Sequence, residues 1–292
     1  ERSSRLRTTR RSSPPALPIA RLWYDHSTYG RRFARHQVAA SRLRGPSSCV
    51  MTTSGSTRDR SRQSPSGRCV VTSCSLRTGW RETWRRHMAG YRGYIDRATK
   101  ESLTAFARGE SRGSASDELG GAARLAPVLY WVEDPWAALE AAVSQSAVTH
   151  NSAPSLAATA LFARMTLRCL EDAAVELRQA LRDSLSAMKR EGQDTALLEA
   201  YMEKASAAVG LSAADMAAVL GQSCHAEHAI PVIMAILLGE SDYRPAMQLN
   251  ARIGGDSATR GMILGAILGA RNGMTDLPEA WLGAVKHLPE LD

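Results

Sequence analysis

The sequence predicts an all-α fold: a compact multi-helix domain over residues 79–292, preceded by a poorly structured arm over residues 1–78. Apolar residues recur at helical spacing from about residue 79 onward, and no segment alternates apolar and polar residues as a half-buried strand does. Short connections containing glycine separate the helical segments. With 292 residues and 44% apolar content, the chain can bury a substantial core.

The predicted arm differs from the rest of the chain in composition. Residues 1–80 hold 16 Arg, no Lys and 3 acidic residues, a net charge of +13, so the other 212 residues carry −5. Three interpretations stay open: an Arg/Ser-rich arm that contacts phosphates, a disordered solvated tail, or a segment that is not natural coding sequence. Composition argues against a nucleic-acid partner, because the segment lacks Lys, interleaved aromatic residues and a known binding motif.

Two apolar stripes are the strongest helix signals in the predicted domain. One consists of Trp84, Met88 and Tyr91, and we expect it to face the core. The other, longer stripe consists of Leu177, Leu181, Leu185 and Met188.

The remaining helices follow from periodicity and capping. Ser212 and Asp215 are typical of a helix N-terminus, where a hydroxyl accepts a backbone N–H and a carboxylate favours the helix dipole. Further helices are expected over 99–108, 136–147, 155–170, 172–190, 194–208, 226–238, 242–250, 257–271 and 278–287.

Composition also bears on where the protein acts. The longest apolar stretches, 230–238 and 262–270, are much shorter than the roughly 20 residues of a membrane-spanning helix. The N-terminal region lacks the apolar segment and cleavage site of a secretory signal. Five scattered Cys without paired spacing fit free thiols in a reducing compartment. We therefore expect a cytoplasmic protein without a membrane partner.

The stretch from Asn250 to Gly269 carries the clearest chemical signal. Gly254 and Gly255 precede Asp256 and Thr259 at the start of a predicted helix, where backbone can approach a ligand and the helix N-terminus favours anions. The alternative is that Asp256 is an ordinary N-cap. Behind it, glycines recur at every fourth residue and predict a surface for close helix packing: Gly261, Gly265 and Gly269. The apolar residues between them are expected in the core: Met262, Ile263, Leu264, Ile267 and Leu268.

A second cluster, Cys224-His225-Ala-Glu227-His228, raises the possibility of zinc, because Cys224 and His228 would be i, i+4 neighbours on a helix. A structural zinc site needs four ligands, and the sequence offers no second Cys/His pair. Zinc is therefore disfavoured.

Several segments, in order, resemble the ADP-ribosylglycohydrolase family over about residues 79–290. The run Gly254-Gly-Asp-Ser-Ala-Thr-Arg-Gly261 is similar to the family's C-terminal signature. The other similar segments are Tyr94-Ile95-Asp96 with Ala98 and Thr99, Asp117 to Pro127, Thr149-His150-Asn151 with Pro154, and Gly221-Gln222-Ser223-Cys224 with His228-Ala-Ile-Pro231. Together they look closest to the branch that includes the lens J-crystallins.

The resemblance implies an orthogonal all-helical fold with a central cleft. Active members use two Mg²⁺ or Mn²⁺ ions to position ADP-ribose and a hydrolytic water. Of the metal ligands, only Asp256 and Thr259 carry over. Ala258 replaces the second aspartate of the C-terminal element, and the N-terminal acidic elements have no counterpart, so Mg²⁺ binding is doubtful.

By the same resemblance, Asp96 is the candidate acid/base carboxylate. Candidate substrate-binding residues are Asp117, Arg124, His150, Asn151, Gly254 and Gly255. Each has a structural alternative: Asp96 as a helix cap, His150 as a hydrogen-bonded core residue, and Arg124 as an ion-pair partner. Two functions therefore stay open. One is an impaired metal-assisted hydrolase of ADP-ribosyl or related N- or O-glycosidic bonds, and the other is a non-catalytic crystallin-like or ADP-ribose-binding remnant.

Overall fold

The computed structural model describes residues 73–285, with side chains from residue 79 onward, and this range forms twelve α-helices and no strand. Most of the predicted arm and residues 286–292 lie outside the described residues. The helices are α3 (Ser73–Ala89), α4 (Arg97–Ala107), α5 (Leu125–Trp131), α6 (Pro135–Ser146), α7 (Ala153–Glu171), α8 (Leu177–Arg190), α9 (Ala196–Ala208), α10 (Ala213–Leu220), α11 (Ala226–Gly239), α12 (Tyr243–Ile253), α13 (Ser257–Asn272) and α14 (Glu279–Ala284). The all-α prediction is confirmed.

Side-chain caps define where many of these helices begin. Ser152, Ser212 and Asp134 each accept a hydrogen bond from the backbone N–H three residues further on, which satisfies one donor of the first turn. In α6 the residue after the cap is Pro135, whose missing N–H costs nothing at that position. The predicted cap at Ser212 is thus confirmed.

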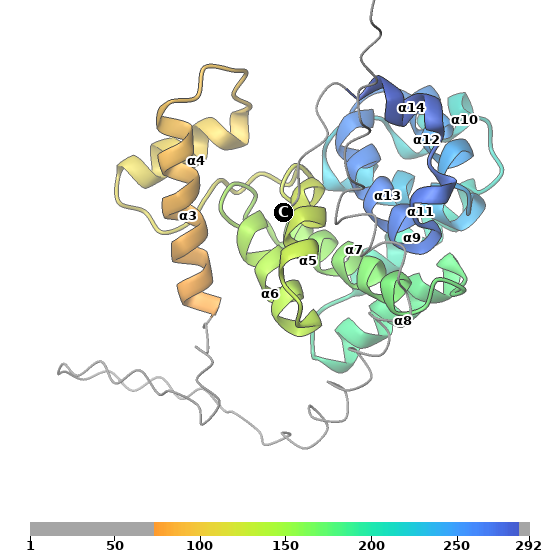
Figure 1. Ribbon diagram of the computed structural model, residues 1–292, viewed down its shortest axis with the longest axis horizontal. Helices are drawn as coiled ribbons and strands as arrows, with labels where there is room; N and C mark the ends of the chain where they lie inside the picture. The colour runs from red at the N-terminus through yellow and green to blue at the C-terminus, as the bar shows by residue number, and fades with distance from the viewer. Residues whose placement is uncertain (1–72, 286–292) are drawn as a thin grey trace, which may run out of the picture.

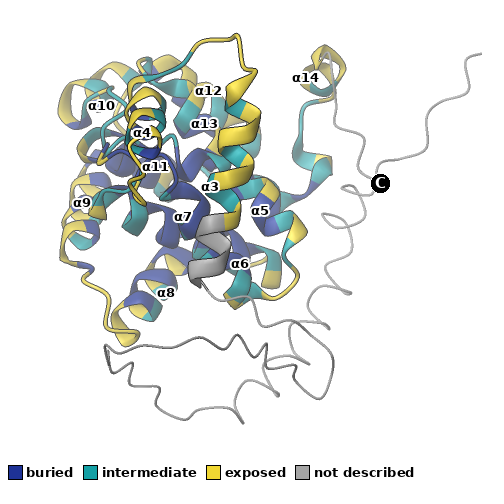
Figure 2. Cartoon of the chain, turned by 90° about the vertical axis from the view of Figure 1, so that its left-hand side faces the viewer, coloured by how far each residue is buried: buried dark blue, intermediate teal, exposed yellow. Residues whose placement is uncertain are grey.

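Helices α7, α11 and α13 form the centre of the molecule. Helix α7 packs against α6, α8 and α13, and α11 packs against α9. Figure 2 shows α7 and α11 as largely buried, with the exposed surfaces on the outer helices. Figure 1 shows α3 and α4 on one side of this core, where α3 packs against α6. The core is rich in alanine, so neighbouring helices can approach closely.

The glycine stripe of α13 is where α12 packs. A Cβ at Gly261 would lie 3.2 Å from the Asn250 amide nitrogen, and one at Gly265 would lie 3.4 Å from the Tyr243 hydroxyl. The predicted structural role of this stripe is therefore confirmed. Met262 was wrongly predicted as core, because it lies on the outer face of α13 and is 53% exposed. Ile263, Leu264, Ile267 and Leu268 are fully buried as predicted.

The other differences from prediction concern helix boundaries. Helix α3 ends at Ala89, so Tyr91 lies beyond it and is exposed, while Trp84 packs edge-on against Phe106. The predicted helix 172–190 begins only at Leu177, because Asp172 ends α7 and a turn follows. Helix α5 was not predicted. It is seven residues long, too short to display a periodic stripe.

No helix among the described residues has both the length and the apolar character needed to cross a membrane.

Shortening one buried side chain at the centre of α7 tests how much core packing contributes to the stability of the fold. Phe162 is fully buried, so Phe162→Ala is expected to lower the free energy of unfolding by about 3–5 kcal/mol, through lost burial and a cavity. Val219 on α10 is exposed, and Val219→Ala should change it by less than about 0.5 kcal/mol. Urea unfolding of both variants makes the comparison; equal effects would contradict the packing described.

Candidate functional site

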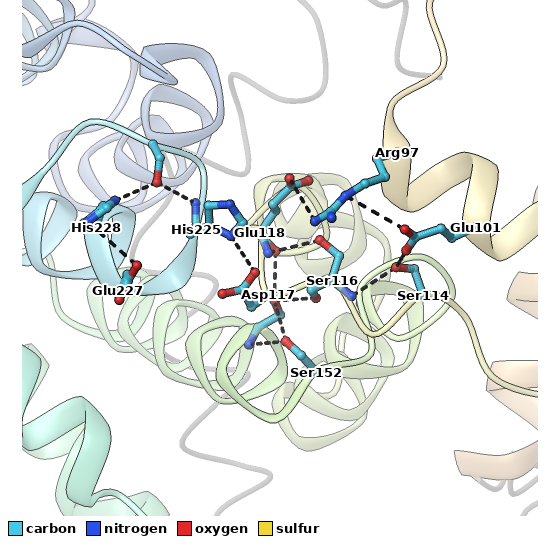
Figure 3. Close-up of polar contacts among 12 residues, drawn as sticks. Arg97, Glu101, Ser114, Ser116, Asp117, Glu118, Ser152, His225, Glu227 and His228 are labelled. Carbon is cyan, nitrogen blue, oxygen red and sulfur yellow. Dashed lines mark hydrogen bonds and ion pairs between the residues drawn. The ribbon is translucent and has the colours of Figure 1, made fainter.

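Two loops far apart in the sequence meet through a short antiparallel backbone pairing. Leu119 N–H donates to the Cys224 carbonyl (3.2 Å), and Ala226 N–H donates to the Asp117 carbonyl (3.0 Å). The pairing sets Glu118 opposite His225. We call this pairing of residues 117–119 with 224–226 the loop junction; Figure 3 shows its side chains Asp117, Glu118 and His225.

The first of these loops is held against the N-terminus of α7. The Ser155 hydroxyl donates to the carbonyl of Glu118 (2.8 Å) and lies 3.3 Å from that of Ser116. At the loop's end, Gly121 packs so closely that a Cβ there would lie 2.1 Å from the Ser146 hydroxyl. The loop is therefore fixed to the helical core from both ends.

Around the loop junction lies a group of four half-exposed polar side chains. The carboxylate of Asp117 lies 2.7 Å from Nδ1 of His225, and this hydrogen bond is the main cause of a raised pKa for His225. The carboxylate of Glu118 faces Arg97 of α4 at 3.8 Å. Burial, followed by the neighbouring Glu118 charge, raises the pKa of the Cys224 thiol to about 11.

A second group contains three of the residues that the family resemblance singled out. Asp96 is the N-cap of α4, where its carboxylate accepts the Thr99 N–H at 2.6 Å. Arg124 donates to Thr149 (2.5 Å) and Gln145 (3.3 Å). Burial lowers the pKa of the Arg124 guanidinium, and the nearby Asp96 carboxylate opposes this shift. Asp96 and Arg124 thus lie within electrostatic reach of each other.

His150 completes this second group. It is only 2% exposed, and its Nδ1 lies 2.8 Å from the Thr149 hydroxyl. Burial, and then the positive charge of Arg124, lower the pKa of His150 to about 4. The imidazole is therefore neutral at pH 7 and serves as a hydrogen-bonding group rather than a cation.

A third group lies at the start of α13. Asp256 is the N-cap and accepts the Thr259 N–H at 3.3 Å, while Gly254 and Gly255 both have positive φ. At Gly255 a Cβ would also lie 2.0 Å from the Gln222 carbonyl oxygen, so only glycine fits. Behind this turn, Arg260 is fully buried and donates to the side chain of Asn250 and to the carbonyl of Gly254.

The loop junction lies between the second and third groups. Gly120 packs on the imidazole of His150, where a Cβ would lie 2.9 Å from Nε2. On the other side, Asp256 N–H donates to the carbonyl of Gln222 at 3.0 Å. All of the predicted site residues except Asn151 thus belong to one continuous region. Asn151 binds the carbonyl of Ser114 through its N–H and lines a separate cavity of about 540 Å³ beside α3 and α6.

Three polar members of the loop junction, Glu118, Cys224 and His225, were not predicted as site residues, and the helical spacing of Cys224 and His228 was wrong. Helix α11 begins at Ala226, so Cys224 precedes it and does not share a helical face with His228. His228 instead lies 2.7 Å from the hydroxyl of Ser223, as a hydrogen-bonding group at the start of a core helix. Glu118 is separated from Cys224 and His225 by more than 100 residues, and no spacing rule could connect them. The adjacency of Glu118 to Asp117 was the only available signal.

The residues at the start of α13 fit a two-magnesium site poorly. Mg²⁺ takes six oxygen ligands in near-octahedral geometry. Here one carboxylate oxygen of Asp256 caps the helix, Ala258 offers a methyl group, and Thr259 offers one hydroxyl. Within residues 79–285, Asp256 belongs to no group of three or more Asp, Glu, His or Cys side chains close enough to share an ion.

The low pKa of His150 gives a pH test of this site. In the unfolded chain His150 becomes protonated near pH 6.5, whereas in the folded chain it becomes protonated only near pH 4. Stability present at pH 7 is therefore lost as the pH falls through this window, by about 2 kcal/mol at pH 5.

Denaturant unfolding of the parent and His150→Gln at pH 7 and pH 5 measures this contribution. The variant should lose less stability between the two pH values than the parent. His87→Gln, at an exposed position on α3, should behave like the parent. Identical pH dependence in parent and His150→Gln would contradict the burial of a neutral imidazole.

Comparison with known proteins agrees with this architecture. A solved structure described as an ADP-ribosylglycohydrolase-related protein complex matches with a TM-score of 0.53 and 21% identity, covering 74% of this chain and 69% of that one; this likeness concerns the fold. No curated protein matches in a sequence search. The sequence model of the ADP-ribosylglycohydrolase family matches residues 31–292, so the match begins within the predicted arm. The chain belongs to the ADP-ribosylglycohydrolase family.

Proposed function

We propose that this chain is an ADP-ribosylglycohydrolase-like protein in which metal-assisted hydrolysis of ADP-ribosyl or related N- or O-glycosidic bonds is impaired. The observation that carries the proposal is the start of α13. There the family's ligand position is occupied by one carboxylate, Asp256, which already caps the helix, and Ala258 supplies no oxygen. A hard divalent cation would find too few ligands in the described part of the chain.

Several features support retained binding of an ADP-ribose-like ligand. The positive-φ turn at Gly254 and Gly255 exposes backbone beside the N-terminus of a 16-residue helix, which favours an anionic group such as a pyrophosphate. Asp117 and His225 offer a half-exposed acceptor and donor at the neighbouring loop junction. Arg124, His150 and Asn151 would act as supporting groups, since their polar atoms are largely engaged within the protein or face the separate cavity.

If hydrolysis is retained, its geometry would centre on Asp96. Cleavage of a glycosidic bond at the ribose passes through an oxocarbenium-like transition state, which a nearby carboxylate stabilises or assists by moving a proton. One oxygen of Asp96 is fixed by Thr99 N–H at 2.6 Å, and the carboxylate lies within electrostatic reach of Arg124. Asp96 would then act as the acid/base or as the group that orients the substrate.

The second candidate is a non-catalytic protein that binds ADP-ribose or serves a crystallin-like structural role. The cap at Asp256 favours it, because Thr259 N–H uses the same carboxylate that a metal would need. The two candidates share a fold and differ in whether Mg²⁺ or Mn²⁺ takes part.

Titration calorimetry of Mg²⁺ and then of ADP-ribose into the full chain separates the candidates. We expect weak or no saturable Mg²⁺ binding, and ADP-ribose binding that does not depend on Mg²⁺. The matched variant is Asp256→Asn, which keeps a side chain able to cap the helix and removes the charge. Ala258→Asp restores one oxygen ligand and should strengthen Mg²⁺ binding.

Tight Mg²⁺ binding by the parent that is lost in Asp256→Asn would contradict the impaired site. That result, together with release of ADP-ribose from a glycosidic substrate, would establish a metal-dependent hydrolase. Absence of both Mg²⁺ and ADP-ribose binding would overturn the proposed ligand and leave the structural role.

A further inference from the structure

Three potential metal ligands of different chemistry meet at the loop junction. A carboxylate oxygen of Glu118, the Sγ of Cys224 and an imidazole nitrogen of His225 all lie within 4.8 Å of one another, and all three residues are half-buried. Within residues 79–285 this is the only such group of three.

We propose that Glu118, Cys224 and His225 form a binding site for a divalent transition-metal ion of the zinc type. Thiolate and imidazole are ligands that Zn²⁺ prefers, whereas Mg²⁺ prefers oxygen alone. In a tetrahedral zinc site the ligand atoms lie about 3.3–3.6 Å apart, so small side-chain rotations bring these three into range. Three protein ligands leave one coordination position for solvent or a bound ligand.

A second observation, independent of the cluster itself, supports this assignment. Asp117 holds Nδ1 of His225 at 2.7 Å, and no hydrogen bond within the described residues engages Nε2. A carboxylate that accepts from one imidazole nitrogen orients the ring and leaves the other nitrogen free to bind a metal, the arrangement found around many zinc sites. Asp117 would thus be a positioning residue for the site.

The backbone also keeps the ligands in place before a metal binds. The hydrogen bonds of Leu119 and Ala226 pair the two loops, and Ser155 fixes the carbonyl of Glu118 to α7. Such pre-positioning lowers the entropic cost of assembling the site. The bound ion would join two segments more than 100 residues apart and so add to the stability of the fold.

Metal binding requires that Cys224 lose its proton and that the ion pair between Glu118 and Arg97 break. The Cys224 thiol loses its proton to solvent and binds as a thiolate. Glu118 exchanges its 3.8 Å ion pair with Arg97 for the metal. The Arg97 side chain is 62% exposed, so water can solvate it after the exchange.

This site is distinct from the magnesium site expected of the family. It adds sulfur and nitrogen to one carboxylate and lies at the loop junction, whereas the family's ligands carried over here are Asp256 and Thr259. The proposal therefore holds whether or not the chain binds ADP-ribose, and it is tested without that ligand.

The test is a titration of the reduced full chain with Zn²⁺ and with Co²⁺. The background carries serine at Cys49, Cys69 and Cys74, which lie outside the described residues and could bind metal themselves. We expect saturable Zn²⁺ binding and, with Co²⁺, the near-ultraviolet charge-transfer band of a thiolate ligand. Cys224→Ser and Glu118→Gln should each weaken binding, Cys224→Ser should abolish the band, and Asp117→Asn should weaken binding by about 10–100-fold.

Two matched variants control the assignment. Cys169 is the other cysteine among the described residues and is buried in α7, so Cys169→Ser should leave the band and the affinity unchanged. His228→Gln should also retain both, because His228 pairs with Ser223. Circular dichroism of Glu118→Gln establishes that lost binding is not lost folding.

Retention of the thiolate band in Cys224→Ser, its loss in Cys169→Ser, or Zn²⁺ binding no tighter than Mg²⁺ binding in a folded parent would overturn the proposal.

Discussion

The candidate site depends on two backbone hydrogen bonds that join residues 117–119 to residues 224–226. Without them the first loop would lose its backbone link to the start of α11, and the side-chain bond between Asp117 and His225 would have to hold the two loops together. In an all-helical domain most backbone groups bond within their own helix, so such a link between distant loops is conspicuous. Here it brings Asp117 and Glu118 to Cys224 and His225.

Close packing of the core makes this link possible. Helices α7, α11 and α13 all contribute alanines to the core, and α12 rests on the glycine stripe of α13. The buried Arg260 then bonds to Asn250 of α12 and to the carbonyl of Gly254, which fixes the turn before Asp256. A buried guanidinium without such partners would be strongly destabilising. Its bonds to the carbonyls of Gln222 and Gly254 tie the start of α13 to the segment that leads into the loop junction.

The fold was largely predictable from sequence because its signals are local. The Leu177 to Met188 stripe and the Ser212 cap are governed by neighbours within a few turns, and both were correct. Errors arose where tertiary context decides: Met262 shares a helix with core residues but faces outward, and Tyr91 lies beyond the end of its helix. Helix α5 is too short for its periodicity to be recognised.

The site was predictable only in part. The motifs identified Asp96, Asp117, Arg124 and Asp256 individually, but their mutual placement depends on contacts between loops. The pairing of Glu118 with His225 joins residues more than 100 positions apart. Because α11 begins only at Ala226, Cys224 lies close to Glu118 and does not share a helical face with His228. Neither a spacing rule nor a helical wheel contains that information. The sequence spacing would place Cys224 and His228 on one helix, whereas in the structure Cys224 lies in a loop, close to Glu118 of another loop.

The most direct measurement of the loop junction is amide hydrogen exchange at Leu119 and Ala226, followed by NMR under native conditions. The structure predicts slow exchange, comparable to that of amides within α7, because both amides are buried and hydrogen-bonded across the loops. Exchange as fast as that of the exposed turn at Gly192 would contradict the pairing, and with it the assembly of the site.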